Sequence, residues 1–269
     1  MEPDNKILLS EEKETLFITL RAKALDSRLA HSILHDDKAD EIHKSIDYDF
    51  NKYGKNNDNL MVVRARQYDE WIKEYLEANQ YASVVYIGCG LDTRIDRIKP
   101  PASVNWFDLD FPEVIDVRKH FYSDKAGYRM IESSAKEESW FNQIPDNCPV
   151  LVIAEGVLVY FTYDEVKVLF QRILDHFTHG EIIFDTINTF ARDYGKEELK
   201  ARTGAEYKWA VDDDAEIRAI SPRLQKITEL PLLKSEFIRG LPLHNRLIHR
   251  FWSLFPQYKN MIGLMRYQF

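Results

Sequence analysis

The stretch Gly88-Cys89-Gly90 and the two aspartates that follow it, Asp108 and Asp110, have the residue types and spacing needed to bind a nucleoside. Glycine adopts positive φ without strain and lets a ligand approach the backbone where a Cβ would block it. Asp108 and Asp110 lie 20 residues after Gly88 and Gly90, where a carboxylate can accept hydrogen bonds from ribose hydroxyls. The alternative role for one of them is to cap a helix that starts at Pro112.

The ligand expected at this site carries no pyrophosphate. Thr93 stands where the dinucleotide fingerprint has its third glycine, and no Gly-Lys-Ser/Thr follows that would indicate a phosphate-binding loop. S-adenosylmethionine is the commonest nucleoside cofactor of this kind. Asp92 or Thr93 is expected to cap the helix that follows the turn.

Further candidate residues stand where apolar runs end. Ligands of open α/β sheets bind outside the carboxyl ends of the strands. That rule adds Glu132, Ser133, Ser134, Ala135, Glu155 and Thr186 to the candidates. Glu155 follows a fully apolar run, so its carboxylate is expected at the edge of the sheet, where it could pair with an ammonium group or form a structural salt bridge. Tyr160, a few residues later, could face an acceptor or fill the core.

The elements that must position these residues alternate from residue 83 onward. Strands are expected at 84–87, 104–109, 128–131, 150–154, 181–186, 223–230 and 261–268, and helices at 92–98, 112–122, 137–143 and 163–177. This alternation predicts an α/β fold with a doubly wound, mostly parallel seven-stranded sheet and helices on both faces. The last two strands would form an antiparallel hairpin at the edge, and the connection at 231–260 is not assigned.

Helical patterns also precede the first strand, at 11–34, 36–53 and 60–79, with a turn at 54–59. We expect them to form an N-terminal helical cap (1–80) over the nucleotide site. The remaining residues, 81–269, form the core domain, with a charged helical insertion on the substrate side near 190–222.

Composition excludes several classes of protein. The net charge of −8 argues against a nucleic-acid surface, and no apolar run reaches the roughly 18 residues that a membrane span needs. The acidic, polar N-terminus does not match a signal peptide, so a cytoplasmic location is expected. Cys89 and Cys148 lie in no CxxC pair, and His176 and His179 end a helix, where the dipole favours cations, so no metal site is expected.

The stretch Gly88 to Arg94, read as Gly-x-Gly-Leu-Asp-Thr-Arg, resembles a signature of the leucine carboxyl methyltransferase-like O-methyltransferases, a family that includes bacterial enzymes of the polyketide-tailoring, tetracenomycin type. Trp106 to Ile115 is similar to the family's Asp-x-Pro-Glu-Val-Ile block, and Ala154 to Phe161 to its Ala-Glu-Gly-Val-Leu block. Residues 14–22 and 47–50 resemble its N-terminal cap. The resemblance covers roughly residues 11 to 190.

The resemblance implies a class I methyltransferase (Rossmann-like) fold that binds S-adenosylmethionine. It matches Asp110 to the family's ribose ligand and Arg64 to an arginine that holds the carboxylate of the cofactor, with Arg21 as a second candidate. Glu155 is implied to line the cofactor site, and Ser133, Ser134 and Ala135 to meet the adenine. No catalytic base is implied.

The function expected from this combination is S-adenosylmethionine-dependent methylation of a carboxylate or hydroxyl on a small molecule, by a monomer or homodimer. A carboxylate acceptor needs no general base because it is already ionised, whereas a phenol of pKa about 10 would need one. Methylation of a protein carboxyl terminus is the alternative within the family. From other classes, a nicotinamide-dependent oxidoreductase and a non-catalytic cofactor-binding protein stay open.

Overall fold

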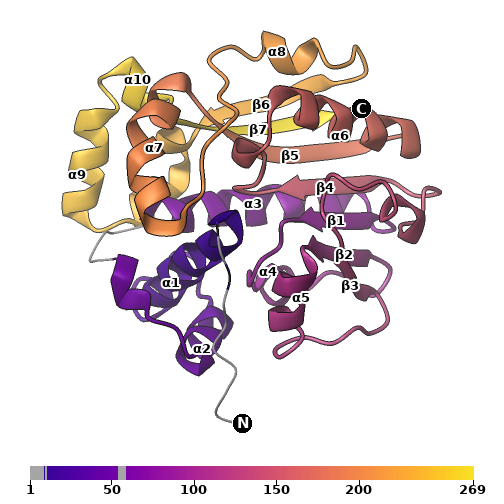
Figure 1. The fold of residues 1–269 in the computed structure, drawn as a ribbon, viewed down its shortest axis with the longest axis horizontal. Coiled ribbons are helices and arrows are strands. Elements are labelled where there is room, and N and C mark those ends of the chain that lie inside the picture. Colours follow the sequence, from indigo (N-terminus) through magenta and orange to yellow (C-terminus); the bar gives the residue numbers. More distant parts are fainter. Residues whose placement is uncertain (1–8, 10, 54–58) are drawn as a thin grey trace.

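The computed structural model describes residues 9, 11–53 and 59–269, so the turn expected at 54–59 falls almost wholly outside the described residues. Its centre is a seven-stranded sheet of order β3-β2-β1-β4-β5-β7-β6 (Figure 1). The strands are β1 Ser83–Ile87, β2 Asn105–Asp110, β3 Tyr128–Glu132, β4 Val150–Ala154, β5 Gly180–Ile187, β6 Gln225–Pro231 and β7 Ile262–Gln268. All of them match the predicted strands to within two residues.

The strands pair as the apolar runs predicted. β1 pairs in parallel with β2 and β4, β2 pairs in parallel with β3 and β4 with β5, and only β7 runs antiparallel, between β5 and β6. β1 and β4 are buried along their whole lengths, as central strands covered on both faces should be. This is the expected class I methyltransferase topology, and its strand order reverses between β1 and β4, where such sheets bind ligands.

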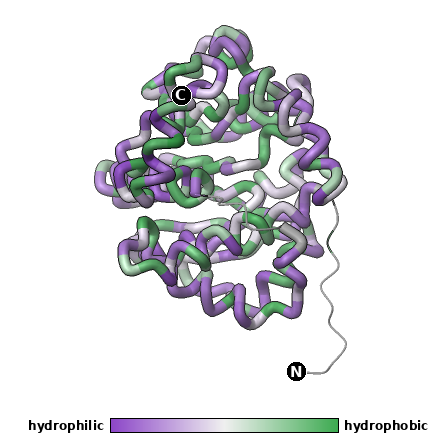
Figure 2. The backbone as a smooth tube through the Cα atoms, turned by 90° about the vertical axis from the view of Figure 1, so that its left-hand side faces the viewer, coloured by the Kyte–Doolittle hydropathy of each residue, from purple (hydrophilic) through white to green (hydrophobic). Residues whose placement is uncertain are grey.

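Helices cover both faces of the sheet. One face carries α3 (Asn59–Ala78), with α4 (Arg94–Ile98) and α5 (Pro112–Arg118). The other face carries α6 (Tyr163–His176), which begins in a capping box between Thr162 and Glu165, and the segment 209–224. Figure 2 shows the apolar residues gathered in the interior strands. Of the helix expected at 137–143, only η3 (Phe141–Gln143) forms, as a single 3-10 turn.

The N-terminal region does not form one continuous cap. η1 (Glu11–Thr15), α1 (Leu16–Ser27), α2 (Asp37–Ser45) and η2 (Phe50–Tyr53) pack together beside α5. α3, in contrast, buries Tyr68, Trp71, Ile72 and Tyr75 against the sheet. The expected cap of 1–80 therefore contains one helix that is part of the core, because α3 has an apolar face long enough to cover the strands.

Two helical regions follow β5, one before β6 and one between β6 and β7. α7 (Thr189–Thr203) and α8 (Ala215–Arg218) occupy the region expected to hold an insertion. The connection that the sequence left unassigned contains η5 (Leu232–Lys234), η6 (Glu236–Gly240), α9 (Leu243–Trp252) and α10 (Pro256–Lys259). α9 and α10 lie at the left edge of Figure 1, beside α7. In the part of the chain that is described, none of the helices combines the length and the apolar character that crossing a membrane requires.

Candidate cofactor and acceptor site

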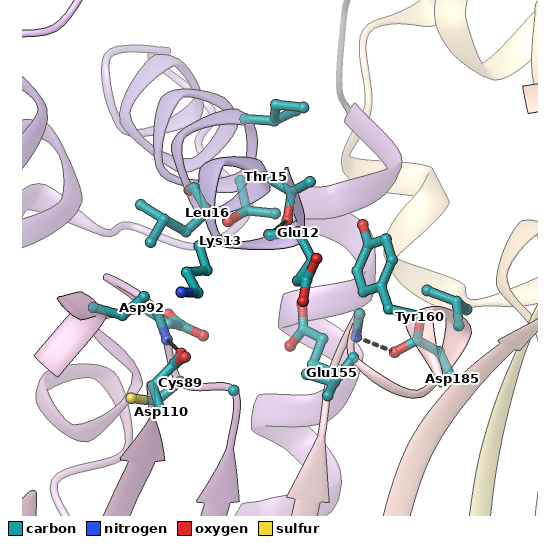
Figure 3. Close-up of a pocket in the computed structure, with 18 of the residues that line it drawn as sticks. Glu12, Lys13, Thr15, Leu16, Cys89, Asp92, Asp110, Glu155, Tyr160 and Asp185 are labelled. Atoms are coloured by element: carbon teal, nitrogen blue, oxygen red, sulfur yellow. Dashed lines mark hydrogen bonds between the residues drawn. The ribbon is translucent and has the colours of Figure 1, made fainter. Parts of the chain in front are cut away.

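A cavity of about 380 Å³ opens at the carboxyl ends of β1 and β4, at the point where the strand order reverses. Its floor is the turn after β1, the end of β2 and the loop after β4, and its roof is η1 and the first turns of α1 (Figure 3). Residues far apart in the sequence, such as Thr15, Gly88 and Tyr207, therefore line a single cavity.

The turn Gly88-Cys89-Gly90 leaves space for a ligand next to its backbone. Gly88 and Gly90 both have positive φ, at 65° and 52°. A Cβ on Gly88 would lie 2.3 Å from Cγ2 of Val157, so only glycine fits there. Cys89 between them is buried, and burial raises the pKa of its thiol, so this cysteine is a neutral wall of the cavity. All three residues predicted from the motif line the cavity.

The structure separates the two aspartates. Asp110 lines the cavity, where its Oδ2 accepts a hydrogen bond from the Gly90 N–H at 2.7 Å and its Oδ1 one from the Phe111 N–H at 2.8 Å. Each oxygen keeps a second lone-pair direction for a ligand hydroxyl. Burial raises the pKa of Asp110 to about 6.

Asp108 is not brought to the cavity. It is fully buried beneath the sheet, where it accepts hydrogen bonds from Arg118, Tyr128 and the Trp106 indole. No ligand in the cavity can reach this buried carboxylate, which leaves Asp110 as the ribose candidate.

Only some residues of the loop after β3 line the cavity. Ser134 lines the cavity, whereas Ser133 and Ala135 are buried and do not. Lys136 also lines it, where it pairs with Glu165 at 2.6 Å. Glu132 points to solvent and pairs with Lys119.

Arg64 and Glu155 both line the cavity, and they bind each other. The Nε of Arg64 lies 3.0 Å from Oε1 of Glu155, and the Nη1 of Arg64 lies 3.1 Å from Oδ2 of Asp185. Arg94, the arginine of the Gly-x-Gly-Leu-Asp-Thr-Arg motif, binds the other oxygen of Glu155. The two arginines hold the pKa of Glu155 down at about 2, so its carboxylate is already paired twice. Arg21, the second arginine candidate, is not among the residues that line the cavity.

Arg94 connects Glu155 to further buried carboxylates below the cavity. It binds Asp69 on α3 at 2.9 Å and lies 3.3 Å from Asp92. Asp92 also binds Lys23 of α1 at 2.9 Å and Arg97 at 2.9 Å. Thr93 stands at the N-cap of α4, as the sequence allowed, but its side chain makes no capping hydrogen bond, because its hydroxyl donates to Asp36.

Asp185 is a residue of the cavity that the sequence reading missed. The rule of strand ends selected Thr186, but it is Asp185 that lines the cavity, and its Oδ1 accepts a hydrogen bond from the Gly156 N–H at 2.6 Å (Figure 3). Burial raises the pKa of Asp185 in spite of the nearby Arg64. A charged residue inside the apolar run of β5 is the signal that could have identified it.

Tyr160 faces the far end of the cavity, away from the glycine turn (Figure 3). Its ring stacks on that of Tyr207, with centroids 5.9 Å apart, and burial raises the pKa of both phenols. Ile187, Leu199 and Ile262 complete this mostly apolar end. Across the described residues, no cluster of three or more His, Cys, Asp or Glu side chains is arranged to hold a metal ion.

Ion pairs join the roof to the rest of the molecule, and the buried pair of Lys23 with Asp92 is one of them. Lys13 of η1 pairs with Glu113 of α5 at 2.9 Å and lies 4.8 Å from the centroid of the Phe111 ring. Leu16 and Leu20 of α1 are buried in a cluster with Leu91 and with residues of α5. A ligand in the cavity would therefore contact η1 and α1 as well as the sheet.

Comparisons with known proteins identify relatives of the whole chain. The model of the leucine carboxyl methyltransferase family matches residues 16–174. The tetracenomycin polyketide synthesis O-methyltransferase TcmP of Streptomyces glaucescens is 32% identical over 266 residues, which cover 98% of each chain. The S-adenosyl-L-methionine-dependent methyltransferase dpfgK of Gibberella zeae is 30% identical over 244 residues, which cover 82% of each chain.

Solved structures also align with the chain. The N-methyltransferase NodS of Bradyrhizobium japonicum WM9, in complex with S-adenosyl-L-homocysteine, aligns with a TM-score of 0.48 and 10% identity, over 85% of this chain and 96% of that one.

Proposed function

Because this chain belongs to the leucine carboxyl methyltransferase family and is an S-adenosylmethionine-dependent O-methyltransferase, we propose that its acceptor is the carboxylate of a small molecule with an apolar body. The observation that carries the proposal is the character of the far end of the cavity. It is lined mainly by tyrosines and aliphatic side chains, and among the described residues no histidine lines the cavity.

The residues on the floor fit the cofactor. A nucleoside can lie on the glycine turn because no Cβ blocks it, and Asp110 can accept hydrogen bonds from the ribose hydroxyls. We place the amino-acid end near Arg64 and Glu155, as the family resemblance implies. Arg64 is also engaged by Glu155 and Asp185, so the cofactor's carboxylate would share it with these residues. S-adenosylmethionine, when bound, would supply a methyl group that an acceptor oxygen attacks in line, and the neutral thioether S-adenosylhomocysteine would leave.

The residues at the Tyr160 end of the cavity favour an acceptor that is already ionised at neutral pH. The pKa of Tyr160 and of Tyr207 is raised by burial, so neither phenol takes a proton from an acceptor at neutral pH. Asp185, one of the carboxylates that line the cavity, is bound by Arg64, Tyr68 and the Gly156 N–H. The protein's contribution is then alignment of the two reactants, which is worth roughly 7–11 kcal/mol in well-oriented systems.

The names of the relatives support an acceptor of the polyketide type. One relative is named for polyketide synthesis, and the match covers nearly all of both chains. The stacked Tyr160 and Tyr207 rings suit a flat, aromatic body. Two free cysteines, Cys89 and Cys148, support a reducing compartment such as the cytoplasm for this reaction.

Transfer of a labelled methyl group tests the proposal. The protein is incubated with methyl-labelled S-adenosylmethionine and with matched pairs of aromatic compounds that carry either a carboxylate or a phenol at the same position. We expect label in the carboxylates, in a form that mild base releases as methanol, because methyl esters hydrolyse and aryl methyl ethers do not.

Two results would contradict the carboxylate proposal. Base-stable label found only in the phenols, at a rate that rises toward pH 10, would show that the enzyme methylates hydroxyl groups. Label found only in a peptide with a free carboxyl terminus, and in none of the small molecules, would favour the protein substrate.

A further inference from the structure

The ion pairs beneath the cavity form one connected network whose charges do not balance. It contains five carboxylates and four cations, all with side chains no more than 8% exposed; the members are Asp36, Asp69, Asp92, Glu155, Asp185, Lys23, Arg64, Arg94 and Arg97. Within the described residues, no further cation pairs with any of these carboxylates. A buried network with an excess negative charge is costly unless a cation completes it.

The excess charge lies at the end of the network that faces the cavity. Asp92 touches three cations, and Asp69 and Glu155 touch two each. Asp185 has only Arg64, at 3.1 Å, and Arg64 is shared with Glu155. Asp36 also has one cation, Arg97 at 2.5 Å, but it lies at the opposite end and does not line the cavity.

The raised pKa of Asp185 agrees with this assignment. Glu155 and Asp92 have pKa values lowered by their arginines, whereas burial outweighs the single arginine at Asp185. Asp185 is thus the member of the network whose negative charge is least compensated, and it lines the cavity.

We propose that Asp185 makes this site select the positively charged sulfonium form of the cofactor over its neutral thioether product. The proposal rests on the methyl-transfer function. S-adenosylmethionine has a net charge of +1, so it completes the network, whereas S-adenosylhomocysteine has a net charge of zero and leaves the excess charge in place. The same charge therefore holds the substrate form of the cofactor and weakens the hold on the product.

Calorimetric titration without acceptor tests the selection. Dissociation constants are measured for S-adenosylmethionine, S-adenosylhomocysteine and 5′-methylthioadenosine, which has neither the sulfonium nor the amino-acid portion. The wild type should bind S-adenosylmethionine more tightly than S-adenosylhomocysteine. Asp185→Asn should lose about ten-fold or more in affinity for S-adenosylmethionine, because one buried charge interaction is removed, and little for the other two ligands.

Two variants serve as controls. Asp185→Glu keeps the charge and should keep the preference. Asp36→Asn removes the same charge from the far end of the network and should keep the ratio of the two affinities within about three-fold, because the interaction weakens with distance. Melting curves of each variant show whether it is folded.

The outcomes distinguish a failure of the selection by Asp185 from a failure of the methyl-transfer function. Equal losses for S-adenosylmethionine and S-adenosylhomocysteine in Asp185→Asn would mean that Asp185 binds the ammonium common to both, and would overturn the selection. Equal losses for all three ligands would show a purely structural role. If Asp36→Asn lowers the ratio of the affinities for S-adenosylmethionine and S-adenosylhomocysteine as much as Asp185→Asn does, the assignment to Asp185 is overturned. Failure of the wild type to bind either amino-acid ligand would instead contradict the methyl-transfer function.

Discussion

At the scale of single residues, the site depends on which carboxylates are already paired and which are open to a ligand. Glu155 is bound by two arginines, whereas Asp110 accepts hydrogen bonds only from backbone N–H groups. A backbone N–H orients a carboxylate without neutralising it. Asp110 is therefore fixed in direction and still able to accept hydrogen bonds from the ribose.

Cofactor binding should depend on pH through Asp110. Its pKa is raised to about 6, and the ribose hydroxyls need its ionised form. Below pH 6 a proton must leave before binding, so affinity should fall with each further unit of pH, by up to about ten-fold. Above pH 6 the affinity should be level. Titration calorimetry between pH 5 and 8 measures this dependence.

The variant Asp110→Asn isolates that contribution, because an amide does not titrate in this range. It should bind the cofactor more weakly at pH 8, by the roughly 1.5–3 kcal/mol of a charge-assisted hydrogen bond, and with less dependence on pH. A wild-type affinity that stays constant from pH 5 to pH 8 would show that Asp110 is not the ribose ligand.

At the scale of elements, α3 has two roles. One face packs on the sheet through side chains such as Ile72, while Arg64 near its N-terminus reaches the cavity and Asp69 in its middle joins the ion network. The position of the cavity arginine is thereby tied to the packing of the core. α1 differs, because it packs on α2 and α5 and reaches the cavity only along its first turns.

Substitutions at a buried position of α3 and at an exposed position of α1 should change the free energy of unfolding by different amounts. Ile72 is fully buried, so Ile72→Ala should lower the free energy of unfolding by about 2–5 kcal/mol. Leu25 on α1 is 39% exposed, and Leu25→Ala should change it by no more than about 0.5 kcal/mol. Denaturant titration of both variants measures the difference. Similar small changes would indicate that α3 is a separable cap rather than a layer of the core.

At the scale of the whole molecule, the cavity lies between two parts of the chain. Its floor belongs to the sheet, and its roof belongs to η1 and α1, which the Lys13–Glu113 and Lys23–Asp92 ion pairs join to the rest of the molecule. A ligand that touches both parts should hold them together.

We expect S-adenosylmethionine to slow amide hydrogen exchange in residues 12–24 as well as around residues 88–90. At a concentration 100 times the dissociation constant, binding should add about 2.7 kcal/mol to the free energy of unfolding, which also raises the melting temperature. Exchange measured by mass spectrometry with and without the cofactor checks this. Protection confined to residues 88–90 would mean that the roof takes no part in binding.

The sequence by itself determined the sheet and the part of the site that is local in the chain. Apolar runs bounded by turn residues located all the strands, because a buried strand needs such a run. Gly88, Gly90 and Asp110 could be identified because their roles follow from backbone freedom and from their place at the end of a strand.

The tertiary structure decided everything that depends on contacts between distant segments. Asp108 and Asp110 lie two residues apart, so strand alternation places them on the same face and cannot tell them apart. What separates them is Arg118, which α5 brings beneath the sheet to bind Asp108. In the same way, the role of Asp185 depends on an arginine 121 residues earlier in the chain, and only the packing of α3 against the sheet brings the two together.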